Sequence, residues 1–362
     1  MNDEADQDLA NGARPGSLVS SIPGQGPAEY GYGVVRSVLL LLWTTLFLSA
    51  CHHIPLRQPV KFPDVLPDEV RQRLYPDREA EGLVLEPIDE GPSANQGVYR
   101  RWKFRFQSNY DDVPEVAGEY YQVSSATAEA PSPLVQIAPI LGGALDGYLT
   151  TRIFANWAAQ DGFSSFFIYQ EEIVLQPERD GAALEGVLRR TTRENVQALN
   201  LFASRPEVDN TRLGCFGVSM GAIKNVLLLA VEPRLRGGVL LLAGGDLARI
   251  VRYSREELVL RYVRGRVERG LSRDEVVQDL RAHLSSDPIH MAPYVGADRV
   301  FMVLGSLDDK VPYATGLALH AALDQPELHV YPLGHYTGIL AAPRAARVGL
   351  DWLRKRLACK GM

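Results

Sequence analysis

The chain has 362 residues, 46% of them hydrophobic, and a formal net charge of −6. This length is enough for one α/β domain with additions and a large buried core. The acidic balance and the lack of a basic tract argue against nucleic acid as a partner, and the sequence shows no dinucleotide-binding loop, internal repeat or metal-ligand cluster, so neither a cofactor nor a metal is expected.

An apolar run at residues 38–50 is the first informative segment. Its thirteen residues are too few to span a bilayer comfortably and are typical of a signal-peptide core. The run ends in LSAC at residues 48–51, which resembles the lipobox of bacterial lipoproteins. The resemblance implies that residues 1–50 are a signal peptide and that Cys51 receives lipid. We therefore expect a lipid-anchored protein of the bacterial cell envelope, at the outer membrane or the periplasmic face of a membrane.

The first 33 residues do not fit a signal peptide. Such a peptide begins with a basic region, whereas this stretch carries several acidic residues and a single arginine, Arg14. We hypothesise that translation starts at Val34 or Val35, which leaves Arg36 as the basic region.

The segment 51–95 is rich in proline and charge, which predicts a tether followed by irregular structure. Alternating residues at 99–107 and 118–124 predict the antiparallel edge of a sheet. A strand at 133–140 is then followed by a loop with Gly142 and Gly143, where two glycines allow backbone to approach a substrate closely.

Residues 217–221 form the pentapeptide Gly-Val-Ser-Met-Gly between a buried strand-like run and an apolar helix-like run. This context predicts a sharp strand-to-helix turn that exposes Ser219 as a nucleophile. Gly217 and Gly221 would remove the Cβ atoms that clash at such a turn.

Two buried runs follow the turn. The first, at 238–243, is continuously apolar, as expected for a strand of a parallel sheet. A mostly helical insertion at 245–294 separates it from the second, at 299–305. Arginines of the insertion are nearly balanced by acidic residues, so we expect a solvated helical face there and no anion site.

A serine nucleophile requires a histidine base and a carboxylate that orients the base. Asp308 and Asp309 follow the strand at 299–305, and Asp246 follows the preceding apolar run. His335 lies in a loop after another strand and is the last histidine of the chain. The other histidines adjoin the processing site, or lie in the insertion, a helix or a strand.

The order Ser219, acid, His335 and the turn at 217–221 resemble the α/β-hydrolase superfamily over residues 96–358. The resemblance implies a mostly parallel sheet with helices on both faces and a helical lid at 245–294. The pattern G-x-x-D before Val-Pro resembles the acid turn of this family, which favours Asp308 and leaves Asp309 to cap a helix near Pro312. Residues 205–212 are similar to the approach to this turn in dienelactone-hydrolase-like and acetyl-esterase-like members.

The same resemblance implies an oxyanion hole that combines the Met220 amide with that of Gly142 or Gly143. Many relatives have His-Gly where this chain has Leu141-Gly142. The expected activity is that of a serine hydrolase, a carboxylesterase acting through an acyl-enzyme on a small-molecule or lipid ester. Two alternatives stay open: an acyltransferase or peptidase with the same residues, and a binding lipoprotein without turnover.

Overall fold

A computed structural model describes residues 51–88, 97–110, 113–141, 144–170 and 174–358. The expected signal peptide, together with Gly142 and Gly143 of the expected oxyanion loop, lies outside the described residues. Within the described ranges, no helix combines the length and apolar character needed to cross a membrane.

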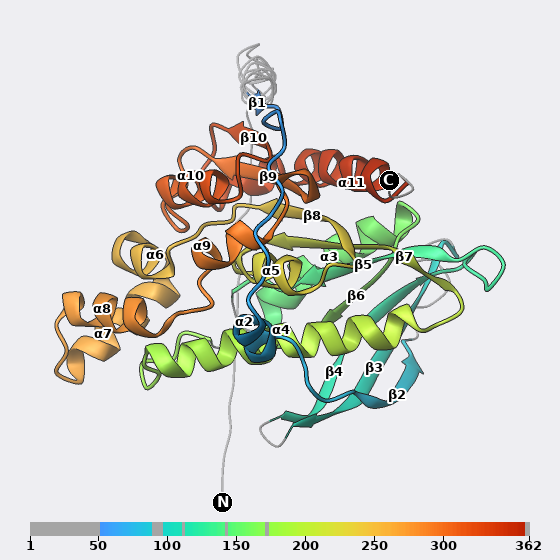
Figure 1. The fold of residues 1–362 in the computed structure, drawn as a ribbon, viewed down its shortest axis with the longest axis horizontal. Coiled ribbons are helices and arrows are strands. Elements are labelled where there is room, and N and C mark those ends of the chain that lie inside the picture. The colour runs from blue at the N-terminus through green and yellow to red at the C-terminus, as the bar shows by residue number, and fades with distance from the viewer. Residues whose placement is uncertain (1–50, 89–96, 111–112, 142–143, 171–173, 359–362) are drawn as a thin grey trace, which may run out of the picture. The chain divides into compact units, whose positions relative to one another are not determined.

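A mixed sheet of ten strands runs through the described part of the chain (Figure 1). In sheet order the strands are β1 (His52–Ile54), β10 (Glu327–Tyr331), β9 (Val300–Gly305), β8 (Leu235–Leu241), β7 (Val208–Val218), β5 (Ser132–Ala138), β6 (Ser164–Ile168), β4 (Val113–Val123), β3 (Tyr99–Tyr110) and β2 (Glu81–Pro87). The central strands from β10 to β6 are parallel. The flanking strands β1 and β4 to β2 are antiparallel.

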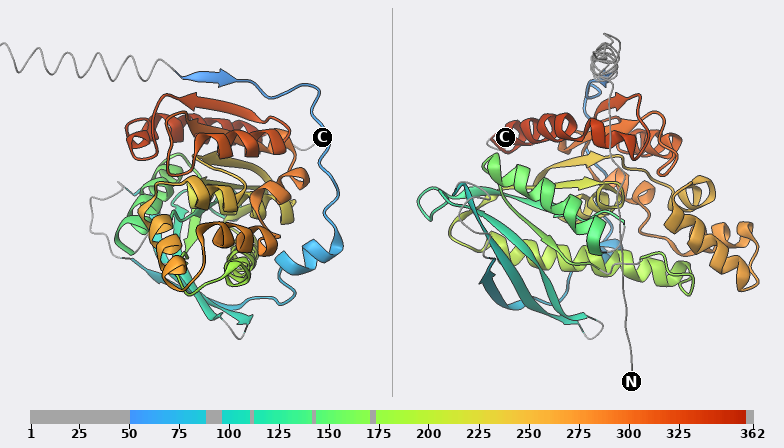
Figure 2. Two further views of the ribbon diagram at one scale, coloured as in Figure 1. Left: turned by 90° about the vertical axis from the view of Figure 1, so that its left-hand side faces the viewer. Right: turned by 180° about the vertical axis from the view of Figure 1, so that it is seen from behind.

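Helices cover both faces of this sheet. The helices of the described residues are α2 (Asp68–Leu74), α3 (Ala144–Gln160), α4 (Gly181–Ala203), α5 (Met220–Val231), α6 (Leu247–Tyr253), α7 (Glu257–Glu268), α8 (Arg273–His283), α9 (Pro288–Met291), α10 (Tyr313–Ala322) and α11 (Ala342–Ala358), with short 3₁₀ helices at Ala292–Tyr294, Ala297–Arg299 and Thr337–Leu340. One face carries α4, α5 and α10, and the opposite face carries α3 and α11 (Figure 2). Such two-sided cover explains why β6 and β9 are buried along their whole length. The expected α/β fold class is confirmed.

Within the segment 51–95, the described residues 51–88 form more regular structure than expected. The segment contributes β1, which pairs with β10, then α2, which packs on α4, and β2, which pairs with β3. Its described prolines lie in the connections and at the end of the edge strand β2, where unpaired backbone is tolerated, and several of its charges lie on α2. The chain after Cys51 is therefore bound to the domain at both sheet edges.

Helices α6, α7 and α8, which follow β8, form a group of their own at one side of the domain (Figure 1). A capping box begins α8, in which Ser272 and Glu275 satisfy each other's backbone amides. The Arg264–Glu257 ion pair is exposed on the outer face, whereas the Arg266–Asp279 pair is largely buried. Apolar side chains of α6, α7 and α8 face inward and line the pocket described next.

Candidate active site

Ser219 occupies a strained turn between β7 and α5. Its φ of 54° and ψ of −124° lie outside the regions that non-glycine residues favour. The surrounding backbone holds this conformation, because the Ser219 amide donates to the Leu241 carbonyl at 2.8 Å and the Ser219 carbonyl accepts from the Ile223 amide at 3.0 Å. The hydroxyl is thereby presented at the carboxyl end of the parallel strands.

Gly217 and Gly221 make this turn possible. A Cβ atom at Gly217 would lie 2.6 Å from the Ala222 nitrogen, and one at Gly221 would lie 2.3 Å from the Ala138 carbonyl oxygen. Both neighbours are backbone atoms, which cannot rotate away. The two glycines are thus required by sterics at the positions that the sequence pattern indicated.

Asp308 and His335 form a direct pair. His335 Nδ1 lies 2.7 Å from Asp308 Oδ2, while Asp308 Oδ1 accepts the backbone amides of Lys310 at 2.9 Å and Val311 at 3.0 Å. With both oxygens engaged, the carboxylate is fixed in position. It can orient the imidazole so that Nε2 is left for another partner.

The other two candidate acids do not contact His335. Asp309 is exposed and pairs with Lys310 at 3.7 Å. Asp246 caps α6, where it accepts the Arg249 amide. The expectation that Asp309 caps the helix near Pro312 is wrong, because α10 has Pro312 at its N-cap position and no side-chain cap.

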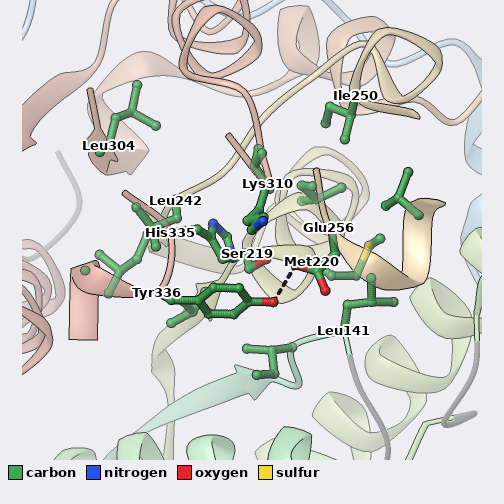
Figure 3. Close-up of a pocket in the computed structure, with 18 of the residues that line it drawn as sticks. Leu141, Ser219, Met220, Leu242, Ile250, Glu256, Leu304, Lys310, His335 and Tyr336 are labelled. Atoms are coloured by element: carbon green, nitrogen blue, oxygen red, sulfur yellow. Dashed lines mark hydrogen bonds between the residues drawn. The ribbon is translucent and has the colours of Figure 1, made fainter. Parts of the chain in front are cut away.

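Ser219, Met220 and His335 all line one cavity of about 280 Å³ (Figure 3). Its other walls are mostly aliphatic. They come from the strand ends, from α4 and from the helices after β8, and include Leu184, Leu188, Leu241, Ile250, Val259, Leu280 and Leu304. Glu256, Lys310, His335 and Tyr336 lie around Ser219 (Figure 3), and the mostly aliphatic remainder of the cavity favours apolar groups.

Backbone donors for an oxyanion are available beside Ser219. Met220 is the first residue of α5, and a helix has no acceptor of its own for its first amides. The partial positive charge of the helix N-terminus adds to this site. Leu141, which precedes Gly142 and Gly143, also lines the cavity.

Tyr336, Glu256 and Lys310 lie at the same cavity and were not anticipated from the sequence. The Tyr336 hydroxyl donates to the Glu256 carboxylate, which joins the loop after His335 to the start of α7 (Figure 3). Partial burial and this carboxylate raise the pKa of Tyr336. Lys310 lies 5.7 Å from the Tyr336 ring centre. Only the direct adjacency of Tyr336 to His335 could have indicated its position.

Two cysteines are described. Cys215 in β7 is fully buried, and burial raises the pKa of its thiol to about 12, so it is not a reactive thiol. Cys51, the expected lipidation site, is partly buried immediately before β1, with its side chain beside Tyr331.

The expectation that the chain has no metal-ligand cluster needs correction. His53, Glu327 and His329 place one ligand atom each within 4.8 Å of one another, on β1 and β10. The cluster is not apparent in the sequence, because His53 is 274 residues from Glu327 and the two meet only when β1 pairs with β10.

Neither protein-family models nor curated proteins match this chain. Solved structures do. Acetyl xylan esterase 1 from Thermoanaerobacterium sp. JW/SL YS485 has a TM-score of 0.53 at 16% identity, covering 79% of this chain and 99% of that one. An acetyl xylan esterase from Paenibacillus sp. R4 has a TM-score of 0.53 at 15% identity, covering 78% of this chain and 100% of that one. An α/β hydrolase from Penicillium sp. sh18 has a TM-score of 0.50 at 16% identity, covering 72% of this chain and 99% of that one. At these identities the likeness shows the fold, which is that of the α/β hydrolases.

Proposed function

We propose that this protein is a serine hydrolase that cleaves carboxylic esters through an acyl-enzyme. Ser219 Oγ attacks the ester carbonyl carbon while His335 Nε2 takes the hydroxyl proton. The Met220 amide, with that of Gly142 or Gly143, stabilises the oxyanion. His335 then donates the proton to the departing alcohol, and a water activated by the same imidazole releases the acid.

The single observation that carries this proposal is the Asp308–His335 pair at a cavity shared with Ser219. The pair is separated by 2.7 Å, and the carboxylate is already held by two backbone amides. The imidazole is partly buried, is oriented by Asp308 and lines the same cavity as Ser219, which supports a role in general-base catalysis.

The cavity also supports a class of ester. Because its walls beyond the polar cluster are aliphatic, it favours acyl or alcohol groups longer than acetyl. Each buried methylene contributes about 0.8 kcal/mol, which corresponds to about fourfold in kcat/KM. We propose apolar, medium-chain or lipid esters as substrates, with the helices of residues 245–294 as a lid over them.

A fluorophosphonate probe and a p-nitrophenyl ester series test this function. The probe is expected to label the wild-type protein and to leave Ser219→Ala unlabelled. kcat/KM is expected to rise by at least tenfold from acetate to octanoate. Labelling that survives Ser219→Ala would remove Ser219 from the mechanism, and a preference for acetate would refute the apolar substrate class.

The same residues could transfer the acyl group to another acceptor or cleave peptides, because the fold constrains the chemistry more tightly than the acceptor. Adding peptides, phospholipids and competing alcohols to the ester panel separates these activities. A binding lipoprotein without turnover would neither react with the probe nor hydrolyse any ester.

We further propose that lipidated Cys51 tethers the enzyme to a membrane surface in the bacterial cell envelope. The LSAC sequence at 48–51 supports this, and β1 begins at the next residue, so the anchor would lie directly against the domain. Cys51→Ser is expected to move the protein from the membrane to the soluble fraction.

Peptides from residues 1–33 in the unprocessed precursor would exclude a start at Val34 or Val35.

A further inference from the structure

We propose that His53, Glu327 and His329 form a binding site for a divalent transition-metal ion, for which Zn²⁺ is the best match. The site lies on the sheet edge formed by β1 and β10, and none of its residues belongs to the cavity that contains Ser219. The proposal is therefore independent of the proposed esterase activity.

Strand register brings the three side chains together. His53 and His329 are direct cross-strand partners in the antiparallel pair, and their ring centres are 4.6 Å apart. Glu327 precedes His329 by two residues, so both side chains extend from the same face of β10. Three side chains of metal-binding type thus converge on one face of the edge.

The distances suit tetrahedral coordination. Zn–N bonds of about 2.0–2.1 Å place neighbouring ligand atoms about 3.3–3.4 Å apart. Glu327 Oε1 lies 3.1 Å from His53 Nε2 and 3.8 Å from His329 Nε2. All three ligand atoms lie within 4.8 Å of one another, so side-chain rotations could bring them to one ion without a change in strand pairing.

The chemistry and exposure of the ligands also fit. Two imidazole nitrogens with one carboxylate oxygen suit borderline cations such as Zn²⁺, whereas Ca²⁺ and Mg²⁺ prefer oxygen ligands. The side chain of His53 is 51% exposed, Glu327 29% and His329 16%, so an ion can enter from solvent. Three protein ligands leave one position for water or for the second Glu327 oxygen.

Such an ion would hold β1 on the sheet. β1 has only three residues and follows Cys51 directly, so its few backbone hydrogen bonds are a weak attachment. A metal shared by β1 and β10 would link the start of the mature chain to the strand that leads to His335. Because the site exists only when the strands pair, the ion would bind the folded state and stabilise it.

Zinc titration of the tag-free full chain tests this site by isothermal calorimetry, with Co²⁺ absorption as a second probe. All proteins carry Cys51→Ser, which removes the neighbouring thiol and the lipid. We expect one Zn²⁺ per chain, and a Tm that rises by a few degrees when free Zn²⁺ is about 100-fold above Kd. His53→Gln and His329→Gln are each expected to weaken binding by at least about 100-fold.

His52→Gln is the matched control. His52 is also exposed on β1 but alternates to the other face, opposite Val330, so its replacement should leave the affinity unchanged. His53 is an exposed edge residue, and unchanged circular dichroism of His53→Gln without metal would exclude misfolding. Absence of saturable binding, or equal affinity in all three variants, would overturn the proposal and leave a simple His53–Glu327 hydrogen bond.

Discussion

The two halves of the candidate active site are built by different means. The turn at residues 217–221, which carries the proposed nucleophile, is set by backbone sterics, because a Cβ at Gly217 would meet the backbone of Ala222 and one at Gly221 the backbone of Ala138 on β5. The Asp308–His335 pair is set by side-chain hydrogen bonds between loops that follow β9 and β10. We therefore expect that a substitution at Gly217 or Gly221 lowers the stability of the fold, whereas a substitution at Asp308 or His335 lowers activity with little loss of stability.

The largest effect is expected at Ser219. Ser219→Ala removes the proposed nucleophile and should reduce kcat by about 10⁶-fold, because the remaining groups cannot replace it. The free energy of unfolding should change little, since alanine adopts the same φ with no larger side chain. kcat on the best p-nitrophenyl ester and urea denaturation measure the two quantities. An active Ser219→Ala variant would contradict the proposed function.

Asp308 tests the second half of the comparison. Asp308→Asn should reduce kcat by about 10⁴-fold, because an amide cannot orient and stabilise the imidazolium as a carboxylate does. Asp309→Asn is the matched control, one residue away and exposed, and should stay within about twofold of wild type. If Asp309→Asn were instead the slower enzyme, the acid would be misassigned although the class of enzyme would stand.

Gly221 tests the first half through stability. Gly221→Ala places a Cβ 2.3 Å from the Ala138 oxygen and should destabilise the fold by about 3 kcal/mol or more. Gly186→Ala is the control within α4, where a Cβ meets nothing within 4 Å and should stabilise by about 0.5–1 kcal/mol. Urea denaturation compares the two. Equal stability of the two variants would show that the turn can relax and would remove the contrast.

The smallest effect concerns Lys224 on α5, behind the nucleophile turn. Its amine is fully buried and bonded to the Gln170 side-chain oxygen, and burial lowers its pKa to about 8. The pKa of a lysine in the unfolded chain is higher, at about 10.4. Between about pH 8 and 10.4 the unfolded chain therefore binds more protons than the folded chain. The contribution of Lys224 to stability therefore rises with pH from about 8 to 10.4.

Lys224→Met removes this titration. Its stability relative to wild type should be most favourable at pH 7 and should decline between pH 8 and 10, by at most about 1.4 kcal/mol per pH unit. Urea denaturation at several pH values measures this difference. A difference that is independent of pH would mean that Lys224 keeps an ordinary pKa in the folded protein.

Much of the fold was predictable from local patterns. Continuous apolar runs indicated β8 and β9, alternation indicated β3 and β4, and the glycines around Ser219 indicated the turn, because each signal depends on residues that are neighbours in the chain. The structure of residues 51–88 was not predictable in this way. Strands β1 and β2 lie at the sheet edges, and their formation depends on β10 and β3 as partners.

The sequence by itself thus determined the class of fold, the strained serine turn, and the set of acids and the histidine that could accompany it. Only the tertiary structure decided that Asp308 rather than Asp309 meets His335, that Tyr336 binds Glu256, and that His53 joins Glu327 and His329. The physical reason is that backbone sterics and hydrophobic periodicity act over a few residues. Loop direction and strand register are settled only when distant segments pack.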